Sequence, residues 1–287
     1  MGIKSSTIPE KISGFSSDIN PRLWPAGEKQ ADQRLDKFIT EKLFDYDKQR
    51  DFPAITGTSR LSPYLAAGMI SARQCFQAAL IENKQQLDSG NKGALTWMSE
   101  LIWREFYKTI LMAAPRVSMN RPYKISADKI KWDFNQKQFD AWKEGRTGYP
   151  LIDAAMRQLK QTGWMHNRLR MIVAMFLVKN LFFDWRLGET YFMSQLIDGD
   201  LAANNGGWQW CASTGTDAAP YFRIFNPITQ SKRFDPEGTF IRQYCPELSL
   251  LDNKVIHEPY RKPIFLNYPK PIIELNTKRS KVLAAYK

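Results

Sequence analysis

DGDLAANNGGWQW, residues 198–210, is the stretch around which the rest of the chain is organised. It places two carboxylates, two adjacent asparagines, a Gly-Gly step and two tryptophans within thirteen residues. A buried polar ligand with a flat ring system would use all of these groups. The local pattern also leaves a simpler interpretation open, in which Gly206-Gly207 ends a capped helix and the tryptophans belong to the core.

Length and composition predict a globular chain without a membrane span. The 287 residues suffice for one large domain or two small ones, and 43% hydrophobic residues supply a sizeable core. The longest strongly apolar run, residues 171–178, is too short to cross a bilayer. The N-terminus lacks the apolar core of a secretory signal. Its Met1-Gly2 and Ser6 match a loose myristoylation pattern that arises often by chance or from a cloned start.

Cysteine and histidine are too sparse for a disulfide framework or a multi-histidine metal centre. Cys75, Cys211 and Cys245 lie far apart, and their odd number argues against a full set of disulfides. His166 and His257 are the chain's two histidines. We therefore expect a reducing compartment and no metal.

The charge of the chain favours a polyanionic partner. Its 41 basic and 29 acidic residues give a net charge of +12, and the isoelectric point is about 9.5. A solvated basic surface without a partner is the simpler alternative, but a pI above 9 fits nucleic acid. The nine tryptophans add side chains that stack on bases or on a flat cofactor.

Apolar spacing predicts an all-helical protein. No run alternates convincingly between apolar and polar residues, and no internal repeat or glycine-rich dinucleotide motif occurs. We expect a connector over residues 1–30 and one helical domain over 31–287. Its predicted helices cover residues 31–50, 94–113, 150–161, a stretch from 166 onward, and 187–200. Residues 114–135 and most of the chain beyond 226 are predicted to be irregular, with a short terminal helix.

The sequence GTSRLSPY, residues 57–64, predicts a phosphate site at a helix start. Thr58, Ser59 and Ser62 supply hydroxyls, Arg60 a guanidinium, and Pro63 suits a first helical turn. Free backbone N–H groups at that turn would complete a phosphate cradle. An ordinary cap, with Ser62 preceding the helix, is the alternative.

Two later helices carry polar groups on a face shared with aromatic residues in the first and with a methionine in the second. Glu100 and Arg104 share such a face with two aromatic residues, although a simple i,i+4 surface pair between them is the common case. The helix from residue 166 places Asn167, Arg170 and Met171 together, where a methionine would ordinarily fill the core.

Taken together, these stretches resemble the C-terminal, FAD-binding half of the photolyase and cryptochrome family. The resemblance extends over about residues 45–260 and is greatest to bacterial class I enzymes that repair cyclobutane pyrimidine dimers in DNA. The matching motifs, in the family's order, are GTSRLSPYLAAG, WMSELIWREFY, EGRTGYPLIDAAMRQL, GWMHNRLRMI and DGDLAANNGGWQWCASTGTDAAPYFRIFNP.

The resemblance implies FAD as cofactor, active in its fully reduced, anionic form. The positions that match the family's diphosphate site are Tyr46, Thr58, Ser59, Leu61 and Ser62. Those beside the flavin ring are Arg170 and Asp198 as an ion pair, Asp200 at the pyrimidine edge, and Asn204 facing N5. An amide there can accept a hydrogen bond from the reduced ring, which favours that state. The Gly206-Gly207 step would let backbone and ring come close.

The resemblance also implies a site for ultraviolet-damaged DNA. Glu100, Trp103, Asn167, Met171 and Trp210 match the dimer pocket, where the two tryptophans would stack against the thymine rings of a dimer extruded from the duplex. A second set of positions matches the family's electron relay and its contacts to the DNA backbone: Trp132, Trp185 and Trp208 for the relay, and Arg168, Arg223 and Lys232 for the backbone.

The implied activity is that of a deoxyribodipyrimidine photo-lyase, a carbon-carbon lyase. Excited reduced FAD would donate an electron to the dimer, whose ring bonds break before the electron returns. Met171 favours the cyclobutane dimer, because family members that repair the (6-4) lesion have histidine at that position. The alternatives are a cryptochrome-like blue-light sensor and a truncated DNA-binding flavoprotein with weak activity.

The chain departs from the family at its N-terminus. Family members ordinarily begin with an α/β antenna domain, and this chain begins in the connector after it, so no antenna chromophore is expected on it. A cloned fragment, a truncated gene and a naturally short protein all remain open. We expect a monomer in the bacterial cytoplasm, at the nucleoid when bound to DNA, with no membrane or metal partner.

Overall fold

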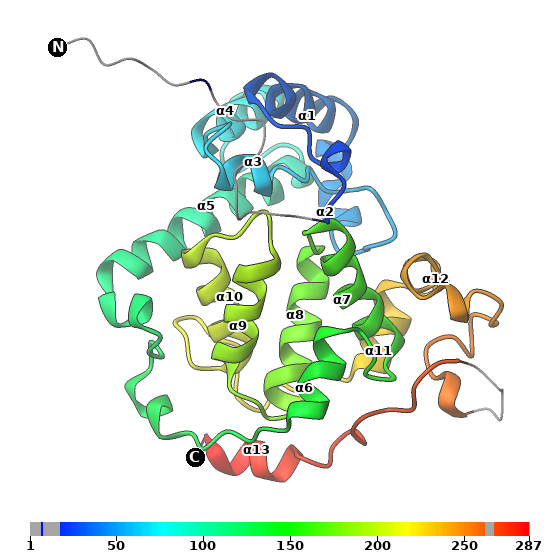
Figure 1. Cartoon of the computed structure of the whole chain (residues 1–287). Helices are drawn as coiled ribbons and strands as arrows, with labels where there is room; N and C mark the ends of the chain where they lie inside the picture. The colour runs from blue at the N-terminus through cyan, green and yellow to red at the C-terminus, as the bar shows by residue number, and fades with distance from the viewer. Residues whose placement is uncertain (1–6, 8–17, 262–266, 287) are drawn as a thin grey trace.

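The computed structural model describes residue 7, residues 18–261 and residues 267–286, and these residues form a helical protein (Figure 1). Most of the expected connector lies outside the described residues. No strand occurs in the described part of the chain, where pairing is limited to an isolated bridge between Asp133 and Phe183. The expected all-helical class is confirmed.

The helices of the first half are α1 (Glu28–Glu41), α2 (Tyr46–Gln49), α3 (Ser62–Ala66), α4 (Ala72–Glu82), α5 (Lys92–Ala113) and α6 (Gln136–Lys143). Those of the second half are α7 (Pro150–Thr162), α8 (Asn167–Met175), α9 (Trp185–Gln195), α10 (Leu201–Ala212), α11 (Pro227–Phe234), α12 (Thr239–Tyr244) and α13 (Arg279–Ala285). A π-helical turn, Phe176–Asn180, extends α8. Short 3-10 turns cover Pro21–Leu23, Leu43–Asp45, Pro115–Met119, Ile125–Lys129, Pro246–Leu248 and Pro259–Arg261.

The apolar residues form two cores joined by α5. One core lies within the lobe of α1 to α5 and includes Phe38, Leu43 and Trp97. The larger core lies among α7, α8, α9 and α10 and includes Trp142 and Trp208. In Figure 1 the first lobe forms the top of the molecule, and α7 to α10 lie side by side below it. The site described below lies where α5 passes α8 and α10.

Local sequence signals explain several helix boundaries. Pro150 opens α7, and Gly163, whose φ of +66° is left-handed, ends it. His166 caps α8 by accepting a hydrogen bond from the Arg168 amide. Burial lowers the pKa of His166 to about 4, so the ring is neutral and its Nδ1 can accept. The predicted pair of helices separated by Gly163 is confirmed.

Other predicted boundaries were wrong. The helix expected over residues 31–50 breaks at Lys42, which directs Leu43 and Tyr46 into the core of the first lobe. The helix expected over 187–200 ends at Gln195. Beyond residue 226 two helices, α11 and α12, replace the predicted loops, because Asn226 and Pro227 provide a cap and a first turn.

Candidate functional site

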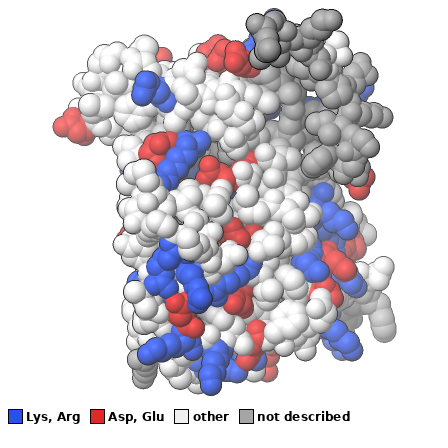
Figure 2. Space-filling model, turned by 60° about the vertical axis from the view of Figure 1, so that its left-hand side comes forward, with Lys and Arg blue, Asp and Glu red and all other residues white. Residues whose placement is uncertain are grey.

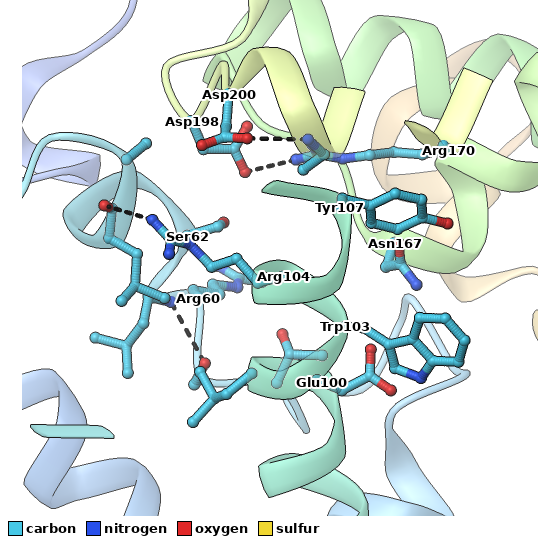
Figure 3. A pocket seen from close by; sticks show the side chains of 18 of the residues that line it. Arg60, Ser62, Glu100, Trp103, Arg104, Tyr107, Asn167, Arg170, Asp198 and Asp200 are labelled. Atoms are coloured by element: carbon cyan, nitrogen blue, oxygen red, sulfur yellow. Dashed lines mark hydrogen bonds and ion pairs between the residues drawn. The ribbon is translucent and has the colours of Figure 1, made fainter. Parts of the chain in front are cut away.

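A cavity of about 520 Å³ lies where the first lobe meets α8 and α10 (Figure 3). Its lining comes from the loop before α3, from α5, from the start of α8 and from residues 198–210. Its volume is in the range of ordinary ligand pockets. The segments predicted to bind a cofactor or a pyrimidine dimer are far apart in the sequence, and the fold brings them around one cavity.

Most residues expected to hold a cofactor or a dimer line this cavity. They are Tyr46, Thr58, Ser59, Leu61, Ser62, Glu100, Trp103, Asn167, Arg170, Met171, Asp198, Asp200 and Trp210. An adjoining cavity of about 150 Å³ is lined by Asn204 and Trp208, and it shares Asp198, Asp200 and Gly207 with the larger one.

The loop before α3 is not an ordinary helix cap. Ser62 is already the first residue of α3, and no side chain caps the helix, so the capping alternative was wrong. Instead, the Ser62 hydroxyl accepts a hydrogen bond from Trp164 Nε1 at 3.1 Å. Its own proton is then directed to another acceptor, such as a phosphate oxygen. Arg60 has a left-handed φ of +53° and a buried Nε without a partner among the described residues.

The expected ion pair between Arg170 and Asp198 is present at one end of the larger cavity (Figure 3). Arg170 Nη2 lies 2.7 Å from Asp198 Oδ2, and the side chain of Asp198 is 1% exposed. Asp198 Oδ1 is buried without a hydrogen-bond partner among the described residues. A buried acceptor of this kind is costly unless a ligand supplies a donor.

Asp200 begins α10 and also lines both cavities. Its Oδ1 accepts a hydrogen bond from the Ala203 amide at 2.9 Å, which caps the helix. One carboxylate thus fixes the start of α10 and places negative charge in the cavity wall.

The side chain of Asn204 is oriented by Glu189. Asn204 Nδ2 donates to the backbone oxygen and to Oε1 of Glu189, both at 3.0 Å. The amide oxygen is therefore left to accept a hydrogen bond within the smaller cavity. Burial raises the pKa of Glu189, while the hydrogen bond from Asn204 opposes that rise. Glu189 was not recognised from the sequence, because the pairing joins two helices.

The two glycines of α10 have different surroundings, and the helix runs through both. The alternative in which Gly206-Gly207 ends a helix was therefore wrong. A Cβ atom at Gly206 would lie 2.2 Å from the Tyr107 ring, whereas one at Gly207 would meet no atom within 4 Å. Only Gly207 lines the cavities. Gly206 permits the approach of Tyr107, and Gly207 leaves space for a ligand.

At the other end of the cavity, α5 presents Glu100 and Trp103. Glu100 Oε1 lies 2.6 Å from Arg50 Nη1, and Arg104 pairs with Glu105. The alternative of a Glu100–Arg104 surface pair was therefore wrong. Trp103 is 41% exposed, and Figure 3 shows its ring on the same side of the cavity as Glu100. An exposed indole can stack on a base, and the neighbouring carboxylate can accept a hydrogen bond from the edge of that base.

The residues predicted to form an electron relay lie in the larger core. Trp208 packs edge-on against Trp142, with ring centroids 6.1 Å apart. Trp185 is buried, and Trp132 is half-buried with its ring centroid 5.1 Å from that of Phe182. Neither Trp185 nor Trp132 lines the two cavities. The relay remains a prediction.

The residues predicted to contact DNA lie outside the cavities. Arg168 pairs with Asp51 at 2.6 Å, Lys232 pairs with Glu258 at 2.7 Å, and Arg223 is exposed. Figure 2 shows Lys and Arg side chains gathered on the lower half of the face that carries the end of α5. Contact between these three residues and DNA remains a prediction.

Three further residues of the site, Arg50, Tyr107 and Trp164, were not predicted to be functional. Tyr107 shares the helical face of Glu100, which is a signal that periodicity could have supplied. Burial raises its pKa to about 12, so its hydroxyl remains a donor at neutral pH. Arg50 and Trp164 act through partners distant in sequence, and no local pattern marks them.

The described residues contain neither a candidate metal site nor a candidate membrane span. In residues 18–261 and 267–286, no group of three or more His, Cys, Asp or Glu side chains could hold a metal ion. No helix of the described chain is long and apolar enough to cross a membrane.

Comparison with known proteins connects this site to a family. Residues 97–287 match the model of the FAD binding domain of DNA photolyase. The chain is 56% identical to the deoxyribodipyrimidine photo-lyase of Escherichia coli (strain K12), an alignment covering 92% of this chain and 56% of that protein. The chain thus spans little more than half the length of that relative.

Solved structures agree with the helical fold. A bacterial class III photolyase from Agrobacterium tumefaciens superposes with a TM-score of 0.86 at 42% identity, covering 92% of this chain and 56% of that one. A cryptochrome from Synechocystis sp. PCC6803 superposes with a TM-score of 0.81 at 32% identity, covering 95% and 58%.

Proposed function

The chain belongs to the DNA photolyase family through its FAD-binding domain, and from this premise we propose that it repairs cyclobutane pyrimidine dimers in DNA under light. The cofactor of the matched domain is FAD. The proposed substrate is ultraviolet-damaged DNA, and the proposed activity is that of a deoxyribodipyrimidine photo-lyase. The arrangement of residues in the larger cavity supports each part of the proposal.

The residues of the two cavities fit FAD. Asp198 Oδ1, an acceptor, and Arg60 Nε, a donor, are buried and have no hydrogen-bond partner among the described residues. Both residues line the larger cavity. Gly207 leaves open space where any other residue would place a side chain. Hydroxyl groups at one wall suit a diphosphate, and a carboxylate and an amide at another suit the polar edge of a flavin.

The chain would hold the cofactor at both of its polar regions. Thr58, Ser59 and Ser62 would donate hydrogen bonds to phosphate oxygens, and Trp164 orients Ser62 for this role. Asn204, oriented by Glu189, presents its amide oxygen as an acceptor. Bound FAD supplies the light absorption and the electron on which dimer splitting depends.

The substrate side of the cavity would bind the two bases. Trp103 and Trp210 supply aromatic faces, and Glu100 and Asn167 supply groups for the base edges. Arg50 holds the Glu100 carboxylate through a 2.6 Å ion pair. Met171 adds an apolar contact with no titratable proton, which fits a cyclobutane dimer.

The observation that carries the proposal is the convergence of both groups of residues on one cavity. The phosphate loop, the Asp198–Arg170 pair and the Glu100–Trp103 pair all line it. A cofactor and an extruded dimer placed there would be close neighbours, as electron transfer between them requires.

The test uses the FAD-loaded, chemically reduced protein and an oligothymidylate that carries one cyclobutane dimer. We expect dimer loss under near-ultraviolet light and none in the dark, measured by chromatography of the oligonucleotide. Trp103→Ala should weaken binding of the damaged strand by roughly 1–3 kcal/mol, the value of one stacked base. Phe44→Ala, which also removes an exposed aromatic ring, is the matched control. Equal dimer loss in darkness would contradict the proposal.

A light sensor is the second candidate, supported by the similarity to the Synechocystis cryptochrome. A sensor would bind FAD and respond to light, but it would leave the dimer intact in the same assay.

We further propose that the protein acts as a monomer in the bacterial cytoplasm, at the nucleoid when bound to DNA.

A further inference from the structure

A second polar cleft lies behind the phosphate loop, on the α1 side. It has a volume of about 380 Å³, and we call it the α1 cleft. Its lining includes Arg34, Lys37 and Lys42 from α1 and the residue after it, together with Thr58, Ser59 and Arg60. The last three also line the cofactor cavity, so one loop separates the two spaces. In Figure 1 α1 lies at the top of the molecule, within the first lobe.

The charge of the α1 cleft is one-sided. Four basic side chains line it, and its lining contains no Asp or Glu. Lys37 pairs with Glu41 at 4.0 Å, where both side chains are more than half exposed. No ion pair of Arg34, Lys42 or Arg60 with an acid occurs among the described residues. Burial lowers the pKa of Lys42; the nearby Glu41 carboxylate opposes this shift, and the neighbouring cations add to it. Like charges held together in this way attract an anion.

The two guanidinium groups of the cleft are held in place by aromatic rings. The Arg34 guanidinium carbon lies 5.5 Å from the Trp24 ring centroid and 5.4 Å from that of Tyr64. The Arg60 guanidinium lies 5.1 Å from the Trp164 centroid. Stacked guanidiniums lose little further freedom when they donate two hydrogen bonds to an oxyanion such as a phosphate.

The supporting rings are themselves fixed. Trp24 Nε1 donates to the backbone oxygen of Thr162 at 2.8 Å, and the Tyr64 hydroxyl donates to that of Pro25 at 2.9 Å. Arg60 adopts a left-handed backbone, which is strained for a residue other than glycine. The two hydrogen bonds hold the Trp24 and Tyr64 rings, and through these rings the Arg34 guanidinium, in one position.

We propose that the α1 cleft binds a small phosphorylated molecule of mononucleotide size, with two or more phosphate charges, at a site distinct from the cofactor cavity. Four cations match a polyanionic group. The volume of about 380 Å³ suits a mononucleotide, whereas a duplex would need an open groove. Because the loop is shared, ligand in the α1 cleft would rigidify the residues that also face the cofactor.

Calorimetric titration of the FAD-saturated protein with inorganic pyrophosphate and with ADP tests the proposal. Saturation with FAD removes the cofactor cavity as a competing site. We expect one pyrophosphate or ADP per chain, and an affinity loss of about tenfold or more for Lys42→Gln and for Arg34→Gln. Lys48→Gln is the matched control, because this exposed lysine pairs with Asp45 and lines neither cavity.

The variants also separate the possible failures. Circular dichroism and flavin content report folding, and Lys42→Gln keeps the test valid if Arg34→Gln disturbs the packing of Trp24. Two outcomes overturn the proposal. One is that neither pyrophosphate nor ADP binds the FAD-saturated protein, and the other is that Lys48→Gln loses as much affinity as the cleft variants. An undamaged duplex that binds through Lys42 and Arg34 while ADP does not would assign the cleft to DNA instead. Each of these results is independent of whether the protein repairs dimers.

Discussion

Replacing Gly207 with alanine should stabilise the cofactor-free protein and weaken FAD binding. Gly207 lies in the middle of α10, where a Cβ atom would meet nothing within 4 Å. Alanine is favoured over glycine in a helix interior by about 1 kcal/mol. The cofactor-free protein should gain about that amount, since nothing opposes the new methyl group.

The same methyl group points into space that FAD is proposed to fill. Gly207 lines the larger cavity and the adjoining one of about 150 Å³. Extra volume in a packed site costs roughly 1–3 kcal/mol, which corresponds to a rise of roughly 5- to 150-fold in the dissociation constant of FAD. Stability and affinity should therefore change in opposite directions.

Gly206→Ala is the matched control, one residue away in the same helix. It gains the same helix propensity of about 1 kcal/mol, but its Cβ atom would lie 2.2 Å from the Tyr107 ring. Overpacking of roughly 1–3 kcal/mol should cancel or exceed that gain. Urea unfolding of the apoproteins measures stability, and flavin fluorescence titration measures affinity. A Gly207→Ala apoprotein less stable than the parent, or unchanged FAD affinity, would refute the reasoning.

Three further predictions concern buried polar groups. Burial lowers the pKa of Lys179 from 10.5 to about 7. Between these two pH values the unfolded chain therefore binds more protons than the folded one, and the free energy of unfolding should rise with pH by up to about 1.4 kcal/mol per unit. Lys179→Met should flatten this slope in urea titrations. Asp198→Asn should cost roughly 1–3 kcal/mol in the same measurement, because the Arg170 guanidinium, 26% exposed, loses its charged partner. Trp164→Phe removes the donor to Ser62 and should weaken FAD binding about fivefold in fluorescence titration.

Each of these three has an outcome that contradicts it. An unchanged pH slope in Lys179→Met would mean that other groups set it. Full stability of Asp198→Asn would mean that the amide replaces the carboxylate without loss. Unchanged FAD affinity in Trp164→Phe would separate Ser62 from phosphate binding.

Local signals in the sequence predicted the elements that local chemistry determines. Pro150 and Gly163 mark the ends of α7 because their backbone preferences act within one turn. The residues of the cavity were predicted through the resemblance to photolyases, whose motifs recur here in order. The structure adds that these motifs surround one space.

The remaining features depend on contacts between distant segments. The hydrogen bond from Trp164 to Ser62 joins residues 102 positions apart. Because no local pattern reveals this bond, the sequence alone suggests that Ser62 is a helix cap. Helix propensity likewise does not predict a helix that continues through Gly206 and Gly207, since two adjacent glycines ordinarily indicate the end of a helix. Tyr107 occupies the space beside Gly206 and explains why a glycine is needed there.

The density of polar and aromatic groups in α10 follows from its contact with three different surroundings. Asn204 and Gly207 face the cavities, while Trp208 packs into the larger core. On another side, Gln209 accepts from the Tyr123 amide at 2.7 Å and donates to Asn205 at 2.8 Å, which fixes the segment after α5. A helix with a single apolar face could pack against a core, but it could not also bind a ligand and fix a loop. The sequence DGDLAANNGGWQW therefore specifies a helix with three occupied faces, and a substitution on one face should leave the other two functions measurable.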